Sequence, residues 1–344
     1  MSGQASPGRL APGRPGALAK RGLAGHGGEA RASREEGWTV KGMFRLRLRH
    51  RKALAGYAFI ALPLLFFLVV RIYPALVAMN VSLHAWDIMS RAKPFVGLDN
   101  YREMLADPVF WQAARNTLLY VLLAVPAELA LGLYVAYLIH SVNKFQGFYR
   151  TVYFIPYITS TVAVSWVWRW LYFKNGGLLN KLLLSVGLPA QPFLTGPGQA
   201  LYCVAAVVIW QALGYYVIIF LAGLEIIPAS YREAARIDGA NAWQVFRYVT
   251  LPLLNPTIVF LAVLGTINSL QIFTQIMNMT SGGYGQGDLG GPLNSTLSLV
   301  VYIYNLAFYK FQMGYASAIT VVLFLLILVV TLVQMKLLNR RIEY

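Results

Sequence analysis

Amide side chains recur within the apolar stretch at residues 256–277. Asn268, Gln271 and Gln275 are spaced at i, i+3 and i+7, which places them on one face if the stretch is a single helix. Amides at such positions can hydrogen-bond a polar solute that crosses a membrane, or they can hold neighbouring helices together. The residues alone leave both interpretations open.

Two other apolar stretches carry polar groups. Glu128 follows Pro126 in the middle of residues 117–139, where an ionisable group is costly and usually faces the protein interior or a wet cavity. A structural and a transport role are equally compatible with it. The stretch at 200–224 adds a polar and aromatic cluster, namely Trp210, Gln211, Gly214, Tyr215 and Tyr216.

Other site chemistries find no support in the sequence. The chain has no glycine-rich loop ending in Gly-Lys-Ser or Gly-Lys-Thr, so it is not itself an ATPase of that type. Its four histidines lack metal-ligand spacing, and Gly285–Gly290 matches a dinucleotide fingerprint without a preceding strand. The single cysteine, Cys203, excludes an intrachain disulfide and is expected to pack as a small apolar residue. We therefore expect no enzyme activity, no metal and no cofactor bound by this chain.

Composition indicates where these groups are held. The chain has 344 residues, of which 58% are hydrophobic and 12% charged, and its mean hydropathy is +0.56. Six mainly apolar runs are each long enough to cross a bilayer, at 54–77, 117–139, 153–173, 200–224, 256–277 and 315–336. The runs lack the period-two alternation of barrel strands, so we predict an all-α membrane protein with six transmembrane helices.

The net charge of +16 is concentrated in residues 1–52, which carry twelve Lys and Arg against three Glu. This segment is rich in Gly, Ala, Pro and Ser and is predicted to be a disordered tail before a six-span domain at 53–340. It has no apolar core of a signal peptide, and no aromatic interleaving that would indicate nucleic-acid binding. Basic residues from Arg45 to Lys52 directly precede the first run, which favours a cytoplasmic N-terminus.

Six spans then place both termini in the cytoplasm. Residues 140–152, 225–255 and 337–344 would lie inside, and residues 78–116, 174–199 and 278–314 outside. Arg71 and Arg169 lie near span ends and are predicted to extend to the membrane interface, Arg169 within an aromatic belt that includes Trp166 and Trp170.

The inside segment 225–255 is long and well patterned, and prolines 228 and 252 bound it. Ser230 and Glu233 have the spacing of a capping box, which predicts a helix that begins at Tyr231. Gly239 supplies a left-handed stop after about eight residues. The segment therefore predicts a short helix between the fourth and fifth spans.

Tyr231, Ala234, Ala235 and Asp238 share one face of this helix, and the two alanines keep the face flat enough to enter a groove on another protein. A second amphipathic turn after Asn241 is predicted to place three apolar residues on one side before Pro252 ends it. Those residues are Trp243, Phe246 and Val249.

The segment resembles the EAA loop of permease subunits in binding-protein-dependent ABC importers. The resemblance is carried by Glu233-Ala234-Ala235, Gly239 and Val249-Thr250-Leu251-Pro252, with Val249 in place of the usual Ile. In that family the loop is the coupling helix that contacts the ATPase. The resemblance thus implies coupling roles for Tyr231, Glu233, Ala234, Ala235, Asp238, Gly239, Leu251 and Pro252.

The resemblance covers about residues 53–340 and is strongest to the carbohydrate-uptake branch, of the maltose and glycerol-3-phosphate type. It is carried by residues 95–120, Met279–Gly283 and residues 313–325. One departure is that Tyr284–Gly291 intervene before Pro292, where the family usually has Pro directly after Gly-Gly.

The branch implies an inner-membrane permease that moves a carbohydrate or related polar solute by alternating access. Its expected partners are a second, homologous permease, an ATPase dimer that binds ATP and Mg, an extracytoplasmic solute-binding protein and membrane lipid. In the family the fourth and fifth spans contact the substrate, which implies Gly214, Tyr215, Asn268, Gln271 and Gln275 here. The alternative is a secondary transporter, which would not need the cytoplasmic helix and for which the runs show no obvious broken helices or repeat.

Overall fold

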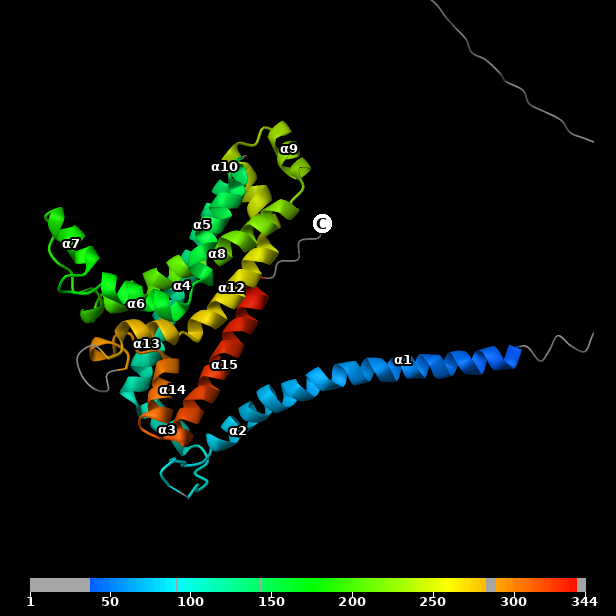
Figure 1. The fold of residues 1–344 in the computed structure, drawn as a ribbon, viewed down its shortest axis with the longest axis horizontal. Coiled ribbons are helices and arrows are strands. Elements are labelled where there is room, and N and C mark those ends of the chain that lie inside the picture. Colours follow the sequence, from blue (N-terminus) through cyan, green and yellow to red (C-terminus); the bar gives the residue numbers. More distant parts are fainter. Residues whose placement is uncertain (1–37, 91, 143, 283–288, 339–344) are drawn as a thin grey trace, which may run out of the picture. The chain divides into compact units, whose positions relative to one another are not determined.

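The computed structural model describes residues 38–90, 92–142, 144–282 and 289–338, and within them it is all-helical apart from two isolated β-bridges (Figure 1). The chain divides after Leu68 into two units. The first unit contains α1 (Trp38–Phe67), so the helix includes residues 38–52, which the sequence predicted as part of the tail. A π-helical turn, Leu68–Ile72, follows it.

The second unit contains the remaining helices. In chain order they are α2 (Tyr73–Val81), α3 (Asp99–Ala106), α4 (Pro108–Ser141), α5 (Gln146–Ile158), α6 (Thr161–Leu171), α7 (Leu178–Ser185), α8 (Ala200–Ile226), α9 (Ala229–Ile237), α10 (Ala242–Val245), α11 (Leu251–Leu253), α12 (Asn255–Leu270), α13 (Thr274–Thr280), α14 (Leu299–Phe308) and α15 (Met313–Leu338). Short 3-10 turns lie at Phe193–Thr195 and Pro292–Asn294, and a π-helical turn, Phe246–Thr250, joins α10 to α11. In Figure 1, α9 and α10 lie at one end of this unit and α3 at the other.

Four helices in the described residues are long and apolar enough to cross a membrane: His50–Val81, Pro108–Ser141, Ala200–Ile226 and Met313–Leu338. A fifth span can be formed by Ala242–Leu253 together with Asn255–Leu270, a pair bent by 65°. The predicted third run, 153–173, is not one of these spans, because it is divided between the two shorter helices α5 and α6.

The prediction that the third and fifth runs are single helices is wrong. The third run breaks at Thr159 and Ser160, whose backbones are extended, three residues after Pro156. The fifth run breaks at 271–273, between α12 and α13, where no proline or glycine signals it. The sequence analysis found no obvious broken helices in the runs, and this interpretation is therefore also wrong.

Side chains from other elements satisfy the backbone at both breaks. The Gln211 amide of α8 donates to the Thr159 carbonyl at 3.3 Å. The Ser298 hydroxyl, which precedes α14, donates to the Ile272 carbonyl at 2.9 Å. Each break is thus held by a partner from outside its own helix, as a low-dielectric interior requires.

Helix α8 packs closely on both α4 and α5. A Cβ added at Gly132 of α4 would lie 2.5 Å from the Cβ of Tyr216 in α8. A Cβ at Gly214 of α8 would lie 2.1 Å from the carbonyl oxygen of Tyr153 in α5. Glycine allows backbones to approach in this way, as at many membrane helix contacts.

A carboxylate joins α4 to the last two helices. Asp107 caps the N-terminus of α4, where its Oδ1 accepts from the Val109 amide at 2.8 Å. Its Oδ2 accepts from the hydroxyl of Tyr302 in α14 and from that of Tyr315 in α15, the latter at 2.8 Å. Partial burial raises the pKa of Asp107, but these hydrogen bonds outweigh it and hold the pKa below its usual value.

Asp107→Asn should lower the free energy of unfolding by about 1–3 kcal/mol at neutral pH, because two hydroxyls and an amide lose a charged acceptor. A depressed folded-state pKa stabilises the fold above the unfolded pKa of about 4, and this contribution is lost as the pH falls through the folded pKa. The difference in Tm between wild type and variant should therefore shrink below about pH 4. Asp99→Asn, which affects an exposed ion pair with Arg102, is the control and should change Tm little. A difference that persists unchanged in acid would contradict this account.

Candidate functional site

A cavity of about 290 Å³ lies among α4, α8 and the break between α12 and α13, and the end of α5 also lines it. Four of the five residues that the sequence assigned to the solute line it, namely Tyr215, Asn268, Gln271 and Gln275. Helix α12 ends at Leu270, so the three amides do not share one helical face. They meet because the cavity wraps around the break between α12 and α13.

The sequence analysis did not indicate that the segment 153–173 contributes an aromatic side chain to this wall. Tyr157, from the end of α5, also lines the cavity, and its ring stacks on Tyr215 with centroids 5.2 Å apart and planes inclined by 24°. The signal that could have found it is the pair of tyrosines at Tyr153 and Tyr157, one helical turn apart beside Pro156. Flat aromatic faces next to amides suit a ring-shaped polar solute.

Gly214 lies outside the cavity lining. It faces the backbone of Tyr153 and Phe154 in α5, where even a methyl group would not fit. The structure therefore places this residue at a helix contact, one position before the tyrosine that does line the cavity.

Glu128 belongs to a buried row on α4, and 3% of its surface is exposed. It lines the cavity together with Tyr216 of α8. Tyr216 in turn lies against Gly265 of α12, where an added Cβ would be 2.2 Å from the phenolic oxygen. The expectation that Glu128 faces the interior or a cavity is confirmed.

Arg169 contacts the protein backbone and Trp166, and its position at a membrane interface stays a prediction. Its guanidinium donates to the carbonyls of Asn278 and Ser281, each at 3.2 Å, and lies 5.0 Å from the centroid of the Trp166 ring. It thereby satisfies the C-terminal end of α13 with a positive charge, which is favourable at that end of a helix. Cys203 is a buried free thiol, as expected.

The short helix of the predicted inside segment is present as α9, but its capping box is not. α9 begins at Ala229, directly after Pro228, and no side chain caps it. Ser230 is thus already within the first helical turn, where its backbone cannot adopt the non-helical conformation of an N-cap. The predicted start at Tyr231 and the pairing of Ser230 with Glu233 are therefore wrong.

The end of α9 agrees with the sequence. Gly239 has a φ of +85°, and its amide donates to the Arg236 carbonyl at 3.0 Å. The Ala240 amide reaches back to the Ala235 carbonyl at 2.9 Å. These two bonds form a Schellman motif, which only a residue tolerant of the left-handed region completes without strain.

A capping box does occur one element later, where the sequence analysis missed it. The Asn241 side chain accepts from the Gln244 amide at 2.9 Å, and the Gln244 side chain accepts from the Asn241 amide at 2.8 Å. The chain then continues through a π-helical turn and Pro252 to Leu253, so the prediction that Pro252 ends the helix is wrong. The wider π turn accommodates a proline, and the 65° bend follows at Leu254.

The predicted apolar face after Asn241 is only partly used for packing. The Phe246 ring meets Tyr137 of α4, with centroids 5.1 Å apart. Trp243 remains 68% exposed, and Val245 is the buried residue instead.

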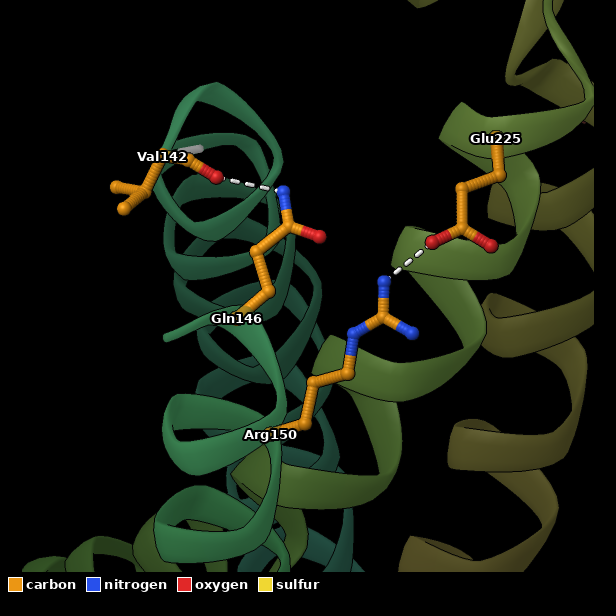
Figure 2. Close-up of polar contacts among 4 residues, drawn as sticks. All are labelled: Val142, Gln146, Arg150 and Glu225. Carbon is orange, nitrogen blue, oxygen red and sulfur yellow. Dashed lines mark hydrogen bonds and ion pairs between the residues drawn. The ribbon is translucent and has the colours of Figure 1, made fainter. Parts of the chain in front are cut away.

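One polar contact attaches α9 to α4, and two others hold α5 to the segments beside it. Arg232 lies 3.0 Å from Nε2 of His140, at the end of α4. Figure 2 shows Arg150 of α5 reaching across to Glu225 at the end of α8, directly before α9. Gln146, one turn earlier in α5, donates to the Val142 carbonyl at 2.6 Å.

Most of α9 is open to its surroundings. Tyr231 is 47% and Ile237 86% exposed, and Glu233, Ala234 and Asp238 are exposed as well. Ala235 is half-buried, as are Leu251 and Pro252 in α11. The proposed contact face is thus largely free within the described chain.

Comparisons with known proteins identify the class. Residues 128–344 match the family model described as binding-protein-dependent transport system inner membrane component. The chain is 37% identical to the probable ABC transporter permease protein YesP of Bacillus subtilis, over 86% of this chain and 93% of the relative. It is 34% identical to the lactose transport system permease protein LacF of Rhizobium radiobacter (84% and 96%) and 33% identical to the trehalose/maltose transport system permease protein MalF of Thermococcus litoralis (84% and 95%).

The fold also matches a solved structure, that of a bacterial ABC transporter involved in the import of the acidic polysaccharide alginate. The TM-score is 0.74 over 87% of this chain and 100% of that one, at 23% identity.

Gly214→Ala should lower the free energy of unfolding by about 1–3 kcal/mol, because the new methyl group overlaps the Tyr153 carbonyl and must push α5 from α8. Thermal unfolding in detergent or nanodiscs measures it. Gly147→Ala is the matched control: this glycine lies within α5 with no atom in the way, so alanine should stabilise the helix slightly. A Gly214→Ala protein that melts like wild type but binds solute poorly would instead favour direct solute contact.

Proposed function

The chain belongs to the family of binding-protein-dependent transport system inner membrane components and is a permease subunit of an ABC importer, and we propose that its cavity beside Tyr215 is the path of a carbohydrate. The observation that carries this proposal is the cavity itself, where stacked Tyr157 and Tyr215 face Asn268, Gln271 and Gln275. Aromatic faces cover the apolar face of a sugar ring, and amides bond its hydroxyls. The names of LacF and MalF, which refer to lactose, trehalose and maltose, support the same class of solute.

The proposed topology has six spans with both termini in the cytoplasm. The broken segments α5–α6 and α12–α13 would be the third and fifth spans, in addition to the four long helices. Of the bent pair, only Asn255–Leu270 would then lie in the membrane, and Ala242–Leu253 would precede it on the cytoplasmic side. Residues 53–340 then form the permease domain, and the segment 225–255 lies on the cytoplasmic side.

The proposed partners follow from the class of transporter. ATP and Mg would bind a separate ATPase dimer, and a second, homologous permease would complete the membrane domain. An extracytoplasmic solute-binding protein would deliver the solute, in keeping with a solved relative of this fold that was captured with its periplasmic protein. A secondary transporter, the alternative from the sequence, is not supported by the family match.

We propose α9 as the coupling helix. It is short, ends in a rigid Schellman motif and projects an exposed face with Tyr231, Ala234 and Asp238. Its anchoring through Arg232 to His140 and through the α8 end to Arg150 would pass movement of the ATPase into α4, α5 and α8. Alternating access would follow from the displacement of these helices.

Glu233→Ala should leave α9 folded, because Glu233 is not a cap and alanine is a stronger helix former. It should still uncouple ATP hydrolysis from uptake, because an exposed contact to the ATPase is lost. Gly239→Pro should uncouple more strongly, since proline cannot adopt the positive φ. The measurement is solute taken up per ATP hydrolysed by the reconstituted importer at matched expression.

Ser230→Ala is the control for the coupling variants. If Ser230 were part of a capping box, the substitution would destabilise α9. In the observed helix Ser230 caps nothing, so the ratio of solute uptake to ATP hydrolysis should not change. Normal coupling in both Glu233→Ala and Gly239→Pro would refute the role of α9.

Gln271→Ala and Asn268→Ala should each raise the KM for uptake about tenfold, because each removes a hydrogen bond from a buried polar solute. Gln199→Ala is a control amide, which lies away from the cavity and bonds Gln191 and the Phe193 amide. If KM and kcat for uptake are unchanged from wild type in both cavity variants, the amides serve helix packing and the proposed path is wrong.

A further inference from the structure

Glu128 is a carboxyl group in the cavity wall without a basic neighbour among the described residues. The ion pairs in the described chain are Arg102–Asp99 and Arg150–Glu225, and Glu128 belongs to neither. No Arg, Lys or His occurs in the described lining of the cavity. The acidic group therefore sets the sign of charge that a solute meets there.

The position of this group is fixed from three helices. Glu128 lies in the buried row of α4, and Gly265 of α12 makes room beside it for the Tyr216 hydroxyl of α8. An added Cβ at Gly265 would lie 3.7 Å from Oε2 of Glu128, so the carboxyl itself is close to α12. Its two oxygens can accept hydrogen bonds.

An anionic solute would be disfavoured in this cavity whichever way Glu128 is protonated. An ionised Glu128 repels a second negative charge at close range. A neutral Glu128 offers one donor but no positive charge to offset the cost of removing an anion from water. Hydroxyl groups, in contrast, can donate to the ionised carboxyl or accept from the neutral one.

We propose that Glu128 is a specificity-determining residue that restricts the solute to neutral, hydroxyl-rich carbohydrates and excludes sugar acids and sugar phosphates. The inference rests on the proposed function, because it concerns the same cavity. It narrows that function, since the resemblance to the carbohydrate-uptake branch leaves glycerol phosphate open as a solute.

The test is equilibrium binding and uptake by the complete importer in nanodiscs or liposomes. The neutral probes are glucose, galactose, lactose, maltose and trehalose, and the anionic probes are galacturonate, lactobionate and glucose 6-phosphate. Wild type should bind at least one neutral probe about tenfold or more tightly than every anionic probe. Glu128→Gln keeps the shape but removes the charge and should reduce this ratio, while Glu128→Ala should weaken binding of the neutral probe about tenfold.

Glu103→Gln, which changes an exposed carboxylate on α3, is the matched control and should keep the wild-type ratio. Thermal unfolding checks that each variant is folded. If Glu128→Ala does not fold, the binding ratio of Glu128→Gln alone tests the role of Glu128. Wild-type binding of an anionic probe as tightly as its neutral counterpart would overturn the inference while leaving carbohydrate import intact. An unchanged ratio in Glu128→Gln would overturn the role of this residue. If no probe of either kind binds or enters, the proposed carbohydrate function itself fails.

Discussion

Backbone carbonyls freed at a helix break must find donors within the protein, because hydrocarbon supplies none. Two such breaks occur in this permease, one of them in the cavity wall, and a side chain of another element satisfies each of them. Gln211 reaches the Thr159 carbonyl, and Ser298 reaches the Ile272 carbonyl. Without the bond from Ser298, the break that places Gln271 and Gln275 around the cavity would carry an unsatisfied carbonyl group, which is costly in a low-dielectric interior.

Helix α8 packs closely against its neighbours and also lines the cavity. Gly214 lets it approach α5, and Tyr216 packs on Gly132 of α4, so both glycine contacts meet within three residues. Tyr215, between them, faces the cavity and stacks on Tyr157. Tyr216 lines the cavity as well, so two aromatic side chains of its wall lie directly beside close helix contacts, which restrict their movement.

The sequence predicted the membrane class, the short helix with its glycine stop, and most of the polar residues in the cavity. These features depend on hydropathy, on a backbone conformation that glycine favours and on residue type, all of which are local. It did not predict the breaks at Thr159 and Gln271, since hydropathy continues across them and the bonds that stabilise them come from distant Gln211 and Ser298. It also misplaced the cap of α9, because Ser230 fits the capping pattern but Pro228 already starts the helix.

Because of the bend at Leu254, α12 can tilt as a rigid rod relative to the elements before it. Its near end, at Asn255, continues directly from the elements that follow α9, and its far end at Leu270 opens into the cavity wall. Sixteen helical residues span about 24 Å, and an α-helix of that length is stiff compared with the break beyond it. A tilt applied at the bend would therefore be delivered, nearly undiminished, to Gln271, and so would change the shape of the cavity wall.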